Sequence, residues 1–122
     1  MKKTSIQIGS EIIHAYVADG FFSKVRGLSF RKSLGKSEAM LFVFKKEGYH
    51  AMWMFGMRFP IDIVWVDKNM RVVDVVECAR PCFLFCKTYK PKRKSKYVIE
   101  LNAHSAKNLK IKIGSKVQIR YK

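Results

Sequence analysis

The stretch PIDIVWVDKNMRVVDVVEC, residues 60–78, determines most of what the sequence predicts about the fold. Residues 60–67 and 71–78 are rich in valine and isoleucine, and the polar residues between them are typical of a turn. Two β-branched runs joined in this way predict a pair of strands in a hairpin. A second hairpin is predicted around Gly9-Ser10 in residues 4–18, because glycine accepts the positive φ of a tight turn.

The remaining pattern also consists mainly of short strands. Further strands are predicted at residues 38–44, 51–55, 97–102 and 115–121. A short helix is predicted over residues 21–30, where Asp19 can cap its start and Gly27 lies near its end. Residues 104–109 form a second helical candidate. Many short strands with little helix predict a mainly β fold, either a β-sandwich or a barrel.

Length and composition limit the class of protein. The chain has 122 residues, which we interpret as a single domain over residues 1–122 with an adequate apolar core. Its apolar runs are far shorter than the roughly 18 residues of a membrane-spanning helix. Because the amino terminus has no continuous apolar run, we expect a soluble, cytoplasmic protein. Three cysteines in a reducing compartment argue against a disulfide framework.

Charge is distributed unevenly along the chain. Residues 1–79 contain 12 Lys and Arg against 8 Asp and Glu, a net charge of +4. Residues 80–122 contain 13 against 1, a net charge of +12. Such a basic segment favours a polyanionic partner, either a nucleic acid or an anionic membrane surface.

Four blocks of sequence resemble a known family. They are GLSFR at residues 27–31, MLFVF at 40–44, WMFGMRFPIDIVWVD at 53–67 and VIEL at 98–101. The chain resembles domain of unknown function 192 over roughly residues 5–121. The resemblance implies a compact jelly-roll-like β-sandwich with one or two short helices, and it implies no established activity or cofactor.

The cysteines and a methionine-rich stretch are candidate metal ligands. Cys78, Cys82 and Cys86 form one C-x3-C-x3-C series, whereas a structural zinc site commonly has two close pairs. We favour small core residues, with metal-binding and redox roles as alternatives. The stretch HAMWM could present His50, Met52 and Met54 to cuprous copper, but methionine beside tryptophan is typical core filling. We therefore predict no bound metal, with the cysteines or the HAMWM residues as the alternative ligands.

Motifs for hydrolysis or group transfer are absent from the sequence. There is no Gly-rich phosphate loop, no G-x-S-x-G elbow and no H-E-x-x-H pair. The histidines, His14, His50 and His104, are far apart. We therefore favour a binding module over an enzyme, with no catalytic residue and no cofactor predicted.

Asp62 is the acidic residue that we most expect to be buried and therefore to need hydrogen-bond donors. Val64 and Val66 share its strand face and apolar residues occupy the other, so burial is expected on both sides. A buried carboxylate needs donors from a guanidinium or from backbone N–H groups. Our hypothesis is a structural pair with Arg31 or Arg58, and the alternative is a catalytic or ligand-binding pocket near Asp62 and Trp53.

The basic segment at residues 87–97, KTYKPKRKSKY, is the candidate polyanion-binding site. Its five closely spaced cations must be exposed, and they are Lys90, Lys92, Arg93, Lys94 and Lys96. Aromatic residues lie on both sides, namely Tyr89, Tyr97, Phe83 and Phe85. Rings that could stack on bases beside charges that could meet phosphates indicate contact with single-stranded RNA. A solvated loop without a partner is the simpler interpretation.

Overall fold

The computed structural model describes residues 2–20 and 33–120. Strands dominate these residues, as the sequence predicts. The strands are β1 (Lys3–Ile8), β2 (Glu11–Ala18), β3 (Glu38–Gly48), β4 (Met52–Trp53), β5 (Ile61–Val66), β6 (Val72–Ala79), β7 (Thr88–Tyr89), β8 (Ser95–Asn102) and β9 (Val117–Ile119). The short helix α2 (Ser105–Asn108) follows β8. Within the described ranges, no helix has the length and apolar character needed to cross a bilayer.

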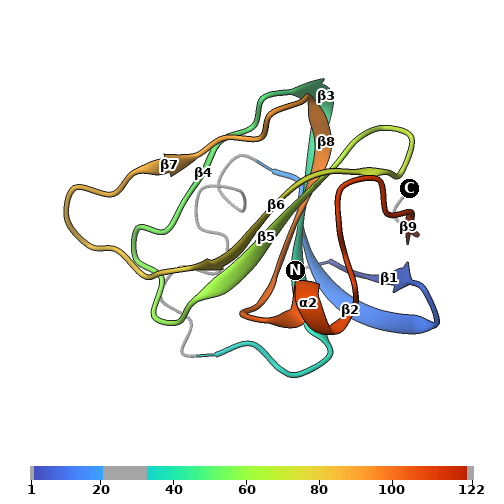
Figure 1. Ribbon diagram of the computed structural model, residues 1–122, viewed down its shortest axis with the longest axis horizontal. Coiled ribbons are helices and arrows are strands. Elements are labelled where there is room, and N and C mark those ends of the chain that lie inside the picture. Colours follow the sequence, from blue (N-terminus) through green and yellow to red (C-terminus); the bar gives the residue numbers. More distant parts are fainter. Residues whose placement is uncertain (1, 21–32, 121–122) are drawn as a thin grey trace.

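Seven strands form one curled sheet in the order β6-β5-β8-β3-β2-β1-β9 (Figure 1). Its neighbouring strands are antiparallel except for β2 and β3, which are parallel. The two ends of the sheet approach each other where residues 70–72 meet residues 114–117. Three backbone hydrogen bonds join these segments, from Val72 N to Ser115 O, Gly114 N to Val72 O and Val117 N to Met70 O. The curl is therefore nearly closed, and few unpaired strand edges remain at this junction.

The sheet buries apolar side chains on both of its faces. One cluster includes Ile6, Val64, Ile99 and Ile119, from strands distributed around the whole curl. The other includes Trp65, and it lies on the opposite face of the central strands. All six residues of β5 are buried, because alternate side chains of this strand enter the two clusters.

Both predicted hairpins are confirmed. β1 and β2 pair across a turn in which Gly9 has φ 60°, and β5 and β6 pair across residues 67–71. In the second turn, the Asp67 carboxylate accepts hydrogen bonds from the backbone N–H groups of Asn69 and Arg71, at 2.9 and 3.0 Å. The Asp67 side chain thus provides an acceptor for two backbone N–H groups of the turn. This local hydrogen bonding favours the reversal of the chain between β5 and β6.

Other expectations have different outcomes. The mainly β class and the helix near residue 105 are confirmed, whereas the strand predicted at residues 51–55 shortens to β4. The helix predicted over residues 21–30 lies outside the described residues. The finer jelly-roll description of the curled sheet remains a prediction.

Strands β4 and β7 form a separate two-stranded ribbon, which lies at the left in Figure 1. Its register pairs Met52 with Tyr89 and Trp53 with Thr88. The chain between β6 and β7 extends beyond this ribbon and is joined to it by a bridge between Phe55 and Cys82. We call β4, β7, Phe55 and residues 80–87 the aromatic lobe.

Candidate functional site

Large apolar side chains are exposed on the aromatic lobe. The exposed fractions are 53% for Trp53, 43% for Phe55, 61% for Phe83, 73% for Leu84 and 95% for Phe85. The rings of Trp53 and Phe55 are tilted against each other with centroids 5.4 Å apart. Exposed apolar groups gathered in this way are typical of an interaction surface, since isolated ones need no explanation but a cluster does.

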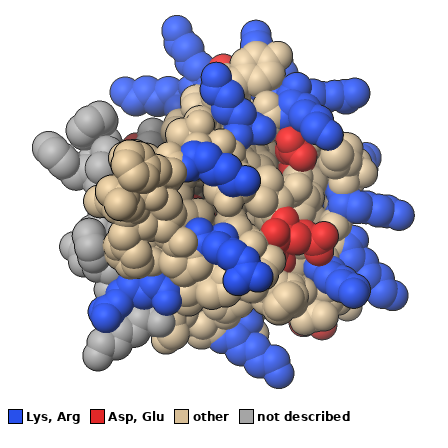
Figure 2. Space-filling model, turned by 60° about the vertical axis from the view of Figure 1, so that its left-hand side comes forward, with Lys and Arg blue, Asp and Glu red and all other residues tan. Residues whose placement is uncertain are grey.

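Positive charge accompanies these apolar groups. Between Glu77 and Glu100 the sequence has seven Lys or Arg residues and no Asp or Glu. Figure 2 faces the side of the molecule that carries the lobe, where Lys and Arg side chains project around and across a surface of uncharged residues, with a few Asp and Glu side chains among them. The basic charge is thus interrupted by uncharged surface, and the exposed apolar side chains of the lobe contribute to that surface. A partner that offers both negative charge and apolar surface fits this arrangement.

The predicted basic loop is exposed, with one change among its aromatic residues. Lys90, Lys92, Arg93 and Lys94 are exposed and Lys96 is partly buried at the start of β8. The loop is fixed in place because Lys92 N donates a 2.9 Å hydrogen bond to Asp74 on β6. The prediction that Tyr97 lies beside these charges for stacking is wrong, since its ring belongs to a core cluster. Tyr89 remains near the surface, with Lys87 Nζ 4.9 Å from its ring centroid.

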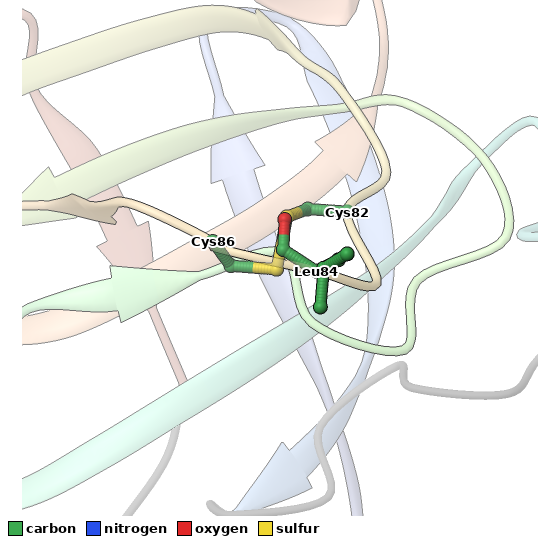
Figure 3. The surroundings of a disulfide bond; sticks show 3 residues. All are labelled: Cys82, Leu84 and Cys86. Carbon is green, nitrogen blue, oxygen red and sulfur yellow. A yellow bond between two sulfur atoms is a disulfide. The ribbon is translucent and has the colours of Figure 1, made fainter.

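The cysteine stretch differs from the prediction of three core residues and from the expectation that the cysteines form no disulfide. Cys82 and Cys86 form a disulfide (Figure 3). Cys78 is a free thiol. All three are partly buried. Strand alternation suggested one buried face, but the chain leaves β6 at Ala79 and turns back within the lobe, which brings Cys82 and Cys86 together. In this oxidised form their sulfur atoms are not thiolate ligands, so the metal alternative does not fit them.

Asp62 is fully buried, as expected, but its partners differ from those proposed. One carboxylate oxygen accepts hydrogen bonds from the N–H groups of Cys78 (2.8 Å) and His104 (3.2 Å). The other oxygen accepts one from Ala106 N at 2.8 Å. The hypothesis of a pair with Arg58 is wrong, because Arg58 is exposed and the ion pair found among the described residues is Lys2–Asp19. Arg31 lies outside the described residues.

Asp62 therefore connects three segments of the fold. It holds the end of β6 and the start of α2 against β5. His104 has φ 76°, which is an unfavourable backbone conformation for a residue with a side chain. The hydrogen bond from His104 N–H to Asp62 supports this conformation. Three backbone N–H donors are enough to explain how this carboxylate can be buried without an arginine partner.

The proposed pocket near Trp53 and Asp62 does not assemble. Trp53 and Phe55 are exposed on the lobe, whereas Asp62 is buried under the opposite face of the sheet with α2. A depression of about 410 Å³ lies elsewhere, between the start of β2, residues 36–38, the end of β8 and α2. The residues proposed for a pocket therefore do not share one.

The candidate copper ligands have separate structural roles. Met54 is buried in the second core cluster and Met52 packs against it. His50 stacks on Phe44 with centroids 3.7 Å apart, and its Nε2 lies 2.9 Å from Lys46 O. This arrangement agrees with the interpretation of the methionines as core filling.

A buried carboxyl that we did not single out in the sequence lies at Glu100. It is 3% exposed on β8, and its register neighbours are Met40 and Ile63. Burial raises the pKa of this side chain to about 8. The signal in VIEL was that Val98 and Glu100 share one strand face while Ile99 and Leu101 share the other, so apolar residues occupy both faces of this strand.

Comparison with known proteins identifies the family. The model of DUF192, described as uncharacterized ACR, matches residues 4–119. The chain belongs to the DUF192 family. This result confirms the resemblance seen in the sequence blocks, and the family has no assigned molecular function.

Relatives in the DUF192 family include UPF0127 proteins of archaea. One from Pyrococcus furiosus is 30% identical over 113 residues, which are 90% of each chain. One from Thermococcus gammatolerans is 34% identical over 89 residues, 71% of this chain and 54% of the relative. The chain thus spans little more than half of that relative, and 59% of one from Thermococcus kodakarensis.

Two crystal structures share the fold. A protein of Sinorhizobium meliloti, described as a candidate transcription regulator, has a TM-score of 0.89 at 22% identity. The match covers 97% of this chain and 94% of that one. A protein of unknown function from Novosphingobium aromaticivorans has a TM-score of 0.84 at 26% identity, with 95% and 83% covered. These similarities establish the fold of this chain. They assign no function, so a function has to be argued from the residues of this chain.

Proposed function

We propose that this chain is a binding module for single-stranded nucleic acid, such as RNA, with the aromatic lobe and the adjoining basic loop at residues 90–96 as its contact surface. The observation that supports this proposal is a group of exposed aromatic rings beside several cations. The sequence between positions 78 and 99 has no Asp or Glu to offset the charge of these cations. Bases would stack on the rings, and phosphates would meet the lysines and arginines. The proposal includes a cytoplasmic location, where RNA is an abundant polyanion.

The fixed position of the basic loop favours this role. The hydrogen bond from Lys92 N to Asp74 holds the cations on the body of the protein without using their side chains. The charged groups therefore stay available for phosphates. The ribbon pairing of β4 with β7 holds Trp53 in the same way, so little order has to be gained on binding.

Removing three of these cations tests the electrostatic part. We expect a variant with Lys92, Arg93 and Lys94 replaced by Ser to bind more weakly. Its plot of log affinity against log salt should be flatter by about two units, because each single-strand phosphate contact contributes a slope of about −0.7. Fluorescence anisotropy of a labelled single-stranded oligonucleotide at several salt concentrations measures both quantities.

A matched variant separates a local contact from net charge. Lys107, Lys110 and Lys112 are exposed in and after α2, and their replacement by Ser removes the same charge away from the lobe. This control should keep a salt slope close to that of the parent. Equal slopes for both variants, or undetectable binding of the parent at low salt, would contradict a nucleic-acid contact at this loop.

Removing aromatic rings tests the stacking part. We expect Trp53→Ala and Phe83→Ala each to weaken binding by about 5- to 150-fold, because stacking contributes about 1–3 kcal/mol per base. The salt slope should not change, since no cation is lost. Ile113→Ala serves as the control, because this exposed apolar side chain lies outside the lobe. Anisotropy that responds equally to all three substitutions would contradict base stacking on the lobe.

A further inference from the structure

The disulfide of the aromatic lobe lies at a surface that a partner can reach. Cys82 and Cys86 are both partly buried, not enclosed in the core. The residues between them, Phe83, Leu84 and Phe85, are among the most exposed apolar side chains of the described protein. Exposed apolar groups therefore lie beside a disulfide whose cysteines are only partly buried.

This disulfide is poorly suited to stabilising the fold. It joins residues only four apart in the sequence. The stabilisation that a disulfide gives through the unfolded chain increases with the length of the loop that it closes, so this short ring contributes less than a disulfide that joins distant segments. It also links no two separate elements of the fold, which leaves room for a role in exchange chemistry.

The ring also contains a strained residue. Phe85 has φ 56°, in the left-handed region. A bulky side chain is unfavourable there, and such conformations persist where the surrounding structure imposes them. Opening the disulfide would release Phe85 to a negative φ, so strain favours the reduced form.

The two sulfur atoms differ in how their backbones are held. Cys82 is anchored, because its N–H donates to Met54 O at 3.3 Å and its carbonyl accepts from Gly56 N at 3.1 Å. Cys82 Sγ lies 3.4 Å from the carbonyl oxygen of Leu84, as Figure 3 shows. A disulfide sulfur has no proton to donate, so this contact becomes a hydrogen bond only when Cys82 is a thiol.

We propose that Cys82 and Cys86 form a site for thiol–disulfide exchange with a dithiol partner that has apolar groups beside its sulfur atoms. This inference is independent of nucleic-acid binding. A thiolate of the partner attacks Cys86 Sγ and forms a mixed disulfide, and the bond to Cys82 breaks. The electron pair leaves on Cys82 Sγ, which takes a proton from water and, as a thiol, donates a hydrogen bond to the Leu84 carbonyl oxygen.

A second step completes the exchange. The partner's second thiolate attacks the partner sulfur that is bonded to Cys86 Sγ in the mixed disulfide. Cys86 then leaves as a thiolate and takes a proton. The partner departs as a disulfide, and the protein holds two thiols. Two electrons have passed from the partner to the protein, and an oxidised dithiol of the same class reverses the reaction.

The apolar residues of the ring define the class of partner. A cysteine pair in a polypeptide with leucine or a similar side chain beside each sulfur would bury these groups against Phe83, Leu84 and Phe85. A partner with serine in those places would lack this contact. Burial of one such side chain corresponds to about a tenfold difference in rate or more.

The experiment uses the full chain in mixtures of reduced and oxidised glutathione. Free thiols are then alkylated and counted by intact mass. We expect one labelled thiol, Cys78, in oxidising mixtures and three in reducing mixtures. We expect Phe85→Gly to lower the equilibrium constant for reduction by about tenfold, because glycine accepts the left-handed conformation without steric cost.

Phe83→Gly is the matched control. It removes the same ring and adds the same backbone freedom, but Phe83 is not among the residues with positive φ. Its equilibrium constant should stay close to that of the parent. Equal shifts in both variants, or a disulfide that remains closed in pure reduced glutathione, would overturn the proposal.

A second measurement tests the partner class. Two synthetic dithiol peptides, one with leucine and one with serine beside each cysteine, reduce the parent protein under the same conditions. We expect the leucine peptide to react about tenfold faster. Equal rates would overturn the assignment of an apolar partner, and neither outcome depends on whether the lobe binds nucleic acid.

Discussion

Asp62→Ala is expected to lower the free energy of unfolding by about 3 kcal/mol or more, because it leaves buried N–H groups without an acceptor. The Asp62 carboxylate accepts three backbone hydrogen bonds, from Cys78, His104 and Ala106. No side chain nearby in sequence replaces it, since its neighbours on this face of β5 are Val64 and Val66. Asp62→Asn should lower the free energy of unfolding by less, because the asparagine amide keeps one carbonyl oxygen as an acceptor.

Chemical denaturation followed by circular dichroism measures this loss. Asp67→Ala is the control, because the Asp67 carboxylate accepts two backbone hydrogen bonds in an exposed turn. Water can replace that acceptor, so we expect a loss nearer 1 kcal/mol. If Asp62→Asn left stability unchanged but removed a measurable activity, the catalytic interpretation of Asp62 would replace the structural one.

The hairpins could be predicted because their signals are local. Strand alternation in residues 60–78 and the turn chemistry of Gly9 and Asp67 act between residues that are close in the sequence. Burial of Asp62 also followed from local pattern, because apolar residues occupy both faces of its strand. What the pattern did not give was the identity of the donors, which come from residues 78, 104 and 106.

The lobe could be predicted only in part, because its geometry depends on distant pairing. The exposure of the 90–94 cations follows from their charge density, which cannot be buried. The exposure of Phe83, Leu84 and Phe85 does not follow, since their composition favours burial. Spacing by four residues fitted a strand or helix face equally well, and only the turn after β6 brings Cys82 to Cys86.

Glu100 shows how the two-sided burial of the sheet changes the chemistry of one residue. Ile99 and Leu101 enter one core cluster, and Val98 enters the other. Glu100 lies on the same side as Val98, between Met40 and Ile63. Loss of hydration disfavours the charged form, so burial raises the pKa to about 8. The side chain is therefore largely protonated at pH 7.

Stability should consequently fall as the pH rises between about 4.5 and 8. In the unfolded chain this carboxyl has its ordinary pKa of about 4.5, so in this range the folded protein binds more protons at Glu100 than the unfolded chain does. Each pKa unit corresponds to about 1.4 kcal/mol, so the contribution lost across the range is on the order of 5 kcal/mol. It is fully present below pH 4.5 and stays absent above pH 8.

Glu100→Met isolates this contribution, because methionine has a similar length and cannot ionise. We expect the variant to be more stable than the parent at pH 8 to 9, and this advantage should shrink steadily toward pH 4.5. Urea denaturation at several pH values measures the difference, with Glu77→Gln as the control because Glu77 is an exposed residue of β6. A stability difference between Glu100→Met and the parent that does not vary with pH would show that folding does not shift the pKa of this carboxyl. The raised pKa, and with it the burial of a neutral acid in the centre of the sheet, would then be wrong.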